Sequence, residues 1–204
     1  MSIKGWRRFA PFYFYAAVVL SLAAAVRNNG PSNGAILILL LFGFLSWGLL
    51  EYVLHRFVFH LEAASVFGRN LVYSAHQTHH ENPKSTEYLF ADLQISVPIA
   101  TGYWLVAWAV LGTWRAASCL FIGLIAGYFC YESLHFLAHQ SSFRLPLFRY
   151  LKKYHLLHHY RTPDLRFGVT SPIFDLLFGT FRPVRDPVRN KNKKGEPASR
   201  VART

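Results

Sequence analysis

The chain has 204 residues, of which 52% are hydrophobic, 17% aromatic and only 16% charged, and its mean hydropathy is +0.20. This length fits one domain, and the low charge excludes a disordered chain and falls below the roughly 25% of soluble domains. The net charge of +12 and pI of 10.0 would also suit a nucleic-acid-binding protein, but such a protein carries a denser charge. We therefore expect one membrane-embedded domain with no nucleic-acid partner.

Four uncharged stretches predict membrane spans, because a charge at the centre of a bilayer costs several kcal/mol. They cover residues 9–26, 35–50, 93–114 and 116–131. The second and fourth have 16 residues each and rise only ~24 Å, so these helices must extend into their flanks or thin the bilayer. A signal peptide is the alternative interpretation of the first stretch, because Lys4, Arg7 and Arg8 precede it. Its aromatic FYFY opening favours a span.

The connections predict two tight hairpins, one closed by residues 27–33 and the other by Arg115 alone. The remaining segments hold 20 of the 22 Lys and Arg residues, so the positive-inside rule places them and both termini in the cytoplasm. We expect the protein to lie in the plasma membrane if it is prokaryotic and in the membrane of the endoplasmic reticulum if it is eukaryotic. Residues 1–181 are predicted to form the membrane domain, and residues 182–204 a basic tail, disordered or lying on the membrane, whose charge is equally explained as a topology signal.

All ten histidines fall in the segments predicted to be cytoplasmic, and they form a repeated pattern. A pair of histidines runs off the second span of each hairpin, and an HxxHH motif begins 16 residues after each pair. The offset between the two halves is close to 79 residues and suggests an ancient duplication. The first half contributes His55, His60, His76, His79 and His80, and the second contributes His135, His139, His155, His158 and His159.

The spacing predicts which imidazoles share a helix face. Residues i, i+3 and i+4 lie on one face, so each HxxHH motif presents three imidazoles in one direction. His55 and His60 are five residues apart, or about 140° on a regular helix, so they chelate one ion less readily and could serve two metals. Ten neutral imidazoles are too many for one ion and predict two metal ions, but imidazole accepts zinc, iron, copper or nickel.

Two carboxylates accompany the histidine pairs on the same helix faces. Glu51 precedes His55 by four residues, and Glu132 precedes His135 by three. We expect them to orient the metal-binding imidazoles from the second shell of ligands. The alternative is that they cap solvated helix ends, and for Glu132 the sequence favours neither.

Read with their neighbours, EYVLHRFVFH, HQTHH, YESLHFLAH and KYHLLHH followed by FGVTSPIFDLLFGT resemble the integral-membrane fatty acid hydroxylase family, within its 2-hydroxylase branch. The resemblance covers about residues 45–180 and implies an all-α protein with four spans and a cytosolic helical cap. It implies that all ten histidines bind two metal ions. These are iron ions in the active form, and the protein as isolated could contain zinc instead. It further implies the use of O2 and external electrons to hydroxylate the acyl chain of a membrane lipid, close to the carboxyl end.

The resemblance also implies a separate electron donor of the cytochrome b5 or ferredoxin type, since the chain has no spare histidine pair for a haem. A cluster of basic residues after the fourth span would attract an acidic carrier. Contacts with lipid phosphates are the alternative, and the sequence alone favours them slightly. The cluster contains Arg144, Arg149, Lys152 and Lys153.

Two other functions fit parts of the pattern. A desaturase, or a sterol or carotenoid relative, uses the same oxidant, although membrane desaturases generally lack a pair like His135 and His139. A histidine-rich metal transporter is less favoured, because transporters place ionisable ligands within their spans. In this sequence the histidines stop at the cytoplasmic ends of the spans.

Overall fold

The computed structural model describes residues 8–27, 30–142 and 144–184, and all regular secondary structure within these ranges is helical. Lys4, Arg7 and most of the predicted basic tail, residues 185–204, lie outside the described residues. The domain boundary at residue 181 therefore stays a prediction.

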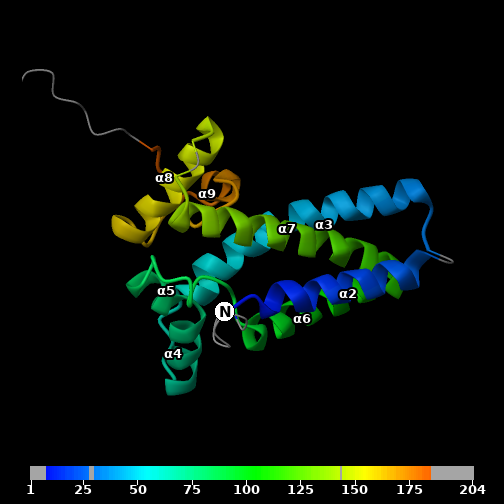
Figure 1. The fold of residues 1–204 in the computed structure, drawn as a ribbon. Coiled ribbons are helices and arrows are strands. Elements are labelled where there is room, and N and C mark those ends of the chain that lie inside the picture. Colours follow the sequence, from blue (N-terminus) through cyan, green and yellow to red (C-terminus); the bar gives the residue numbers. More distant parts are fainter. Residues whose placement is uncertain (1–7, 28–29, 143, 185–204) are drawn as a thin grey trace, which may run out of the picture.

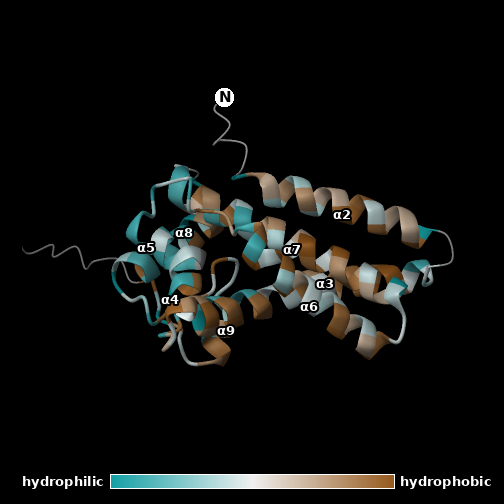
Figure 2. Cartoon of the chain, turned by 90° about the horizontal axis from the view of Figure 1, so that it is seen from below, coloured by the Kyte–Doolittle hydropathy of each residue, from teal (hydrophilic) through white to brown (hydrophobic). Residues whose placement is uncertain are grey.

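Four long helices run side by side and form the body of the molecule (Figure 1). They are α2 (Ala10–Arg27), α3 (Asn33–Val53), α6 (Leu93–Leu111) and α7 (Trp114–Gln140). All four are long and apolar enough to cross a membrane. Their outward faces are rich in hydrophobic residues (Figure 2), and Leu20, Ile38 and Val110 are among the most exposed side chains. Such a surface is suited to lipid and would be unfavourable in water.

The second and fourth spans extend into their flanks, as their short uncharged stretches predicted. α3 continues into a π-helical segment, η1 (Leu54–Phe59), so that the apolar helix covers Asn33–Phe59, or 27 residues. α7 also has 27 residues. The break between the third and fourth spans differs from the prediction, because it lies at Gly112 and Thr113. Gly112 has a φ of 70° and ends α6, while the Thr113 hydroxyl accepts the first N–H groups of α7, which places Arg115 inside that helix.

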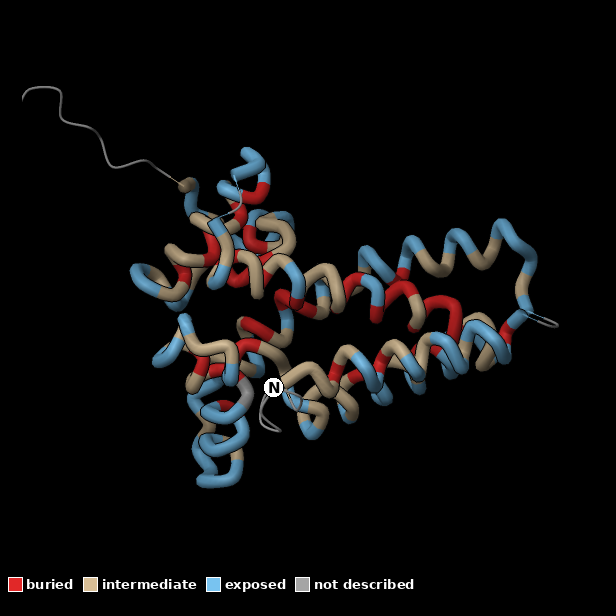
Figure 3. Tube along the Cα trace, in the orientation of Figure 1, coloured by how far each residue is buried: buried red, intermediate tan, exposed pale blue. Residues whose placement is uncertain are grey.

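α7 is the central helix of the bundle. In its most apolar window 61% of the residues are buried, against 11% to 17% in the other three spans, and Figure 3 shows this buried core along α7. α3 lies unusually close to it. A Cβ atom added to Gly43 would lie 2.0 Å from the Leu120 carbonyl oxygen, and one added to Gly123 would lie 2.1 Å from the Leu40 carbonyl oxygen. Small residues allow this backbone contact, which sets the ends of α3 and α7 beside each other.

The cap lies at the end of the bundle opposite the two hairpin loops (Figure 1). Between α3 and α6, η1 is followed by α4 (Val66–Val72), η2 (Tyr73–Gln77) and α5 (Thr78–Glu81). After α7 come α8 (Pro146–Tyr160) and α9 (Ile173–Leu177). The first HxxHH motif lies on η2 and α5 and the second on α8, so both reach the cap from separate parts of the chain.

Candidate metal centre

The structure gathers the ten predicted histidines into two clusters of five, in each of which the candidate ligand atoms all lie within 4.8 Å of one another. The first cluster contains His55, His60, His76, His80 and His158. The second cluster contains His79, His135, His139, His155 and His159. The clusters adjoin, because the rings of His80 and His159 are stacked with their centroids 4.2 Å apart.

The two clusters are related by the sequence repeat, with one exchange. Each takes four histidines from one half of the chain and the middle histidine of the HxxHH motif from the other half. His79 and His158, which occupy equivalent positions 79 residues apart, are the exchanged pair. The exchange links the two halves, because neither half can complete its cluster alone.

His55 and His60 lie in the same cluster, which differs from the expectation that they could serve two metals. The cause is the π-helical geometry of η1, whose hydrogen bonds join residues five apart and which widens the turn. The two rings lie with their centroids 5.2 Å apart. The expectation assumed a regular α-helix, in which these side chains would diverge.

The two HxxHH motifs face the centre, but each divides its imidazoles between the clusters. His76 and His80 belong to the first cluster, and His79, between them, belongs to the second. On a helix, i and i+4 are 40° apart, whereas i+3 lies about 60° to the other side. This angle allows the middle imidazole to turn away from its neighbours.

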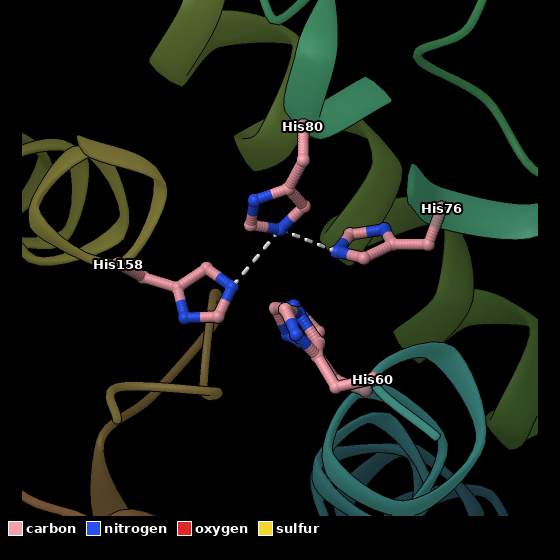
Figure 4. Close-up of side chains that lie close together, drawn as sticks. His60, His76, His80 and His158 are labelled. Carbon is pink, nitrogen blue, oxygen red and sulfur yellow. Dashed lines mark hydrogen bonds between the residues drawn. The ribbon is translucent and has the colours of Figure 1, made fainter. Parts of the chain in front are cut away.

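The Nε2 atoms converge within each cluster. In the first, the His80 Nε2 atom lies 2.9 Å from that of His76 and 3.2 Å from that of His158 (Figure 4). In the second, the His155 Nε2 atom lies 2.9 Å from that of His139 and 3.0 Å from that of His159. Lone pairs aimed at one another at this distance repel unless a proton or a cation lies between them. The arrangement therefore fits a metal ion in each cluster.

A short segment, residues 165–170, fixes two imidazoles of the first cluster, and we call it the brace loop. The His55 Nδ1–H group donates to the Phe167 carbonyl at 2.6 Å, and the His158 Nδ1–H group donates to the Leu165 carbonyl at 2.8 Å. A carbonyl can only accept a hydrogen bond, so these contacts select the tautomer whose Nε2 atom carries the free lone pair. That lone pair is the one a metal would take.

Two buried carboxylates hold the brace loop in turn. Glu51 accepts the backbone N–H groups of Val169 and Thr170 at 2.5 and 3.0 Å and the Thr170 hydroxyl at 2.6 Å. Asp175 accepts the N–H groups of Phe167 and Gly168 at 2.8 and 2.9 Å. Four successive N–H groups thus end on two side chains, which leaves the loop carbonyls free to meet the histidines.

Glu51 and Glu132 do not cap solvated helix ends, because their exposures are only 4% and 1%. Glu51 orients His55 through the brace loop, and no hydrogen bond between either carboxylate and an imidazole occurs in the described part of the chain. Glu132 accepts the Ala91 backbone N–H group at 3.2 Å and so anchors the segment that leads into α6. Both carboxylates therefore act on the backbone, and their second-shell role at the metals stays a prediction.

The cap histidines are held neutral at physiological pH. Burial, followed by the proximity of other imidazoles, lowers the pKa of His79 to about 3 and that of His80 to about 4. The same causes lower the pKa of His76 and His155 well below the usual value of 6.5. A neutral imidazole is the form that binds a metal, so both clusters suit cations.

A narrow cavity of about 60 Å³ runs from the histidines between α2, α3, α6 and α7. His55 and His76 of the first cluster and His79 and His135 of the second reach its wall. The remaining lining is mostly apolar or aromatic and includes Leu54, Phe59, Leu89, Ile95, Ile99, Leu124, Ile125, Tyr128 and Tyr131. A slender apolar ligand could therefore lie against both clusters.

Comparison with known proteins identifies relatives of this chain. The family profile described as fatty acid hydroxylase matches residues 40–180, which include every histidine of both clusters. The chain belongs to the fatty acid hydroxylase family. It is 37% identical over 166 residues to the dihydroceramide fatty acyl 2-hydroxylase FAH2 of Arabidopsis thaliana, covering 79% of this chain and 67% of that protein.

A yeast relative and a solved structure extend the comparison to the fold of the family. The ceramide very long chain fatty acid hydroxylase SCS7 of Saccharomyces cerevisiae is 34% identical, over 84% of this chain and 44% of its own length. The solved structure described as full-length scs7p, with only the hydroxylase domain visible, matches with a TM-score of 0.79 and 32% identity. The structural match covers 88% of this chain and 68% of the scs7p chain. The predicted family and four-span helical fold are confirmed.

The histidine motifs predicted the family of this chain, but the sequence did not reveal the residues that hold the imidazoles in place. Asp175, Phe167 and Leu165 received no role, although the segment FGVTSPIFDLLFGT had been noted as part of the resemblance. A carboxylate inside the apolar run IFDLL was an available signal, because a charged group among apolar neighbours needs buried partners. The metal-ligand role of the ten histidines itself stays a prediction.

Proposed function

We propose that this fatty acid hydroxylase uses two iron ions and O2 to hydroxylate the fatty acyl chain of a membrane lipid at carbon 2. The observation that carries the proposal is the cavity that touches histidines of both clusters while continuing between the apolar spans. Relatives named as dihydroceramide fatty acyl 2-hydroxylases support the acyl chain as substrate and carbon 2 as its site. The narrowness of the cavity favours a linear chain over a sterol ring.

The chain's own residues would position the substrate and exclude water. The metal pair would supply the activation of O2 and the oxidation of the C–H bond. Leu124 and Ile125 line the part of the cavity that would hold the acyl tail, and Tyr128, Tyr131 and Glu132 line the part nearest His135. Polar side chains in that place can bind the carbonyl end of the acyl group, so that the adjacent carbon faces the clusters.

The chemistry requires an external reductant. One C–H bond breaks and one C–O bond forms, while the second oxygen atom leaves as water. O2 takes up four electrons in total, two from the C–H bond and two from a donor, together with two protons. A separate carrier of the cytochrome b5 or ferredoxin type therefore belongs to the proposal.

The test is reconstitution of the purified chain with ferrous iron, a donor and a dihydroceramide under 18O2. We expect one 18O atom at carbon 2 of the acyl chain, located by tandem mass spectrometry. A double bond without label would indicate a desaturase. Absence of any oxidised product from ceramides, free acids and acyl carriers would reject the proposal, and metal-dependent flux into vesicles lost in His79→Ala would favour the transporter.

The proposed topology places the cap and both termini in the cytoplasm, in the plasma membrane of a prokaryote or the endoplasmic reticulum of a eukaryote. The support is the distribution of charge, because Arg27 and Arg115 are the only basic residues near the hairpin ends. Reporter fusions at residue 30 and at the C-terminus test it. A cytoplasmic signal from the residue-30 fusion would contradict the proposed orientation.

A further inference from the structure

A basic groove of about 480 Å³ lies on the outer face of α8, outside the metal centre. Leu156 and Leu157 form part of its wall, and Tyr160 stands at its edge with 57% of its surface exposed. Its basic lining residues are Arg144, Arg149, Lys152, Lys153 and Arg161. Between residues 141 and 162 the sequence has these five basic residues and no acidic one.

The groove lies directly behind the metal centre, because α8 has two different faces. Leu151, Tyr154, His155 and His158 are buried on the inner face. The outer positions Arg149 and Tyr160 are exposed, and on a helix they lie roughly opposite His158 and His155 respectively. A single helix, with a diameter of roughly 10 Å, therefore separates a molecule in the groove from the clusters.

One side chain connects the groove to the second cluster. The ring of Tyr160, exposed in the groove, has its centroid 6.3 Å from that of His159. An electron donor seated on Tyr160 would thus approach a candidate metal ligand through one aromatic contact. No deep channel needs to open for the transfer.

We propose that this groove is the docking site of the acidic one-electron carrier that supplies the two electrons of each turnover. The inference rests on the proposed function, since activation of O2 at the metal pair takes two electrons from an external carrier in each turnover. The carrier delivers one electron per encounter, so two carriers are oxidised for each O2 consumed and each hydroxyl group formed. Charge complementarity fits the transient, salt-sensitive encounters typical of redox partners.

The position of the groove favours a protein over a lipid surface. α8 ends at the tip of the molecule farthest from the loop joining α2 and α3, as the gold end of the helix in Figure 1 shows. Tyr160 and Arg161 lie at that end of α8, and both are exposed. The exposed apolar residues Leu145 and Leu147, at the opposite end of α8, are outside the groove lining.

The test measures binding of an acidic cytochrome b5 haem domain, and separately of an acidic ferredoxin, to the metal-loaded full-length chain. We compare Arg149→Glu with the matched control Lys84→Glu, which makes the same charge change at an exposed cap residue outside the groove. Arg161→Glu is the second groove variant. The groove variants are expected to weaken binding about tenfold at low salt and the control less than twofold.

Several outcomes decide the proposal. A groove variant counts as folded if its metal content and unfolding temperature equal those of Lys84→Glu. If the groove variants and the control bind the carrier equally well at high salt, the interface depends on charge, which supports the proposal. Equal weakening by control and groove variants, or no binding of either carrier to the wild-type chain, overturns it. Binding in detergent that disappears in phosphatidylcholine nanodiscs means that lipid covers the groove, and also overturns it.

Dithionite-driven hydroxylation by the wild-type chain tests the proposed function independently. Product formed with dithionite, together with unchanged carrier binding in Arg149→Glu, rejects the groove and retains the hydroxylase. Groove-dependent carrier binding without any hydroxylated product rejects the proposed function and retains the redox interface.

Discussion

The two histidine clusters have the same number and kind of ligands, but the protein holds them differently. In the first, His55 and His158 donate Nδ1–H groups to the brace loop, which Glu51 and Asp175 hold in turn. In the second, the buried Nδ1 atoms of four imidazoles have no hydrogen-bond partner within the described residues. These are His79, His135, His155 and His159.

This difference teaches that sequence symmetry does not produce symmetric support. The brace loop follows α8, and the segment after α5 is only a partial counterpart of it. Ala91 donates its N–H group to Glu132 there, but within the described residues no carbonyl of that segment accepts a hydrogen bond from the buried Nδ1 atoms of the second cluster. The first cluster is thus tied by directional hydrogen bonds, whereas the second depends on helix packing and ring contacts. We expect the first site to be the more rigid and the second the more adaptable.

The largest expected effect comes from a substitution that disrupts both clusters together, so that the two no longer differ. Gly123→Val places side-chain atoms against the Leu40 backbone and forces α3 away from α7, whose ends carry a histidine pair each. We expect a loss of about 3 kcal/mol of stability, with both metals lost in parallel. Thermal unfolding in detergent and metal analysis measure this. Gly102→Val, at a helical position with open space, is the matched control and should retain both metals.

The exchange of His79 and His158 between the halves gives the second prediction. His158→Ala should weaken the first metal site, and His79→Ala the second, each with at least about 100-fold loss of hydroxylation. Metal titration followed by spectroscopy of the remaining site distinguishes the two. If His158→Ala instead weakened the site of His155 and His159, the division by cluster would be wrong. Asn82→Ala, a nearby exposed residue, should leave both sites intact.

Loss of a brace carboxylate should affect one cluster only. Asp175→Ala leaves the N–H groups of Phe167 and Gly168 buried without their acceptor, at about 1–3 kcal/mol each. We expect the first metal site to bind roughly 10–100-fold more weakly while the second is unchanged. Equal weakening of both sites would argue against the asymmetry. Glu62→Ala, which removes an exposed carboxylate, controls for charge.

The smallest effect concerns one hydroxyl of the brace. The Thr170 hydroxyl donates to Glu51, so Thr170→Val should lower stability by about 1 kcal/mol and slightly weaken the first metal site. Thr170→Ser keeps the donor and should restore both properties. If Ser and Val behaved alike, the hydroxyl would have no part in holding the loop. Thermal unfolding and metal titration provide the comparison.

The sequence predicted much of the fold because a bilayer imposes simple rules. Uncharged stretches located all four candidate spans, two of which extend into their flanks, and the histidine motifs located the cap. The helix break near Arg115 was misplaced because charge was used to end a span, whereas Gly112 and Thr113 end and begin the helices through cap geometry. The contacts of the brace loop with Glu51 and His55 were missed because they join residues more than 100 positions apart, such as Glu51 and Val169.

By itself, the sequence determined that this chain is a four-span helical protein with ten histidines gathered at one end, because hydropathy and helical spacing are local properties. Only the tertiary structure decided how those histidines divide. The π-helical turn of η1 brought His55 and His60 together, and the packing of α3 against α7 set the two halves close enough to exchange His79 and His158. The first is a departure from regular helix geometry and the second depends on contacts between distant segments, so the spacing of the histidines along the chain predicts neither.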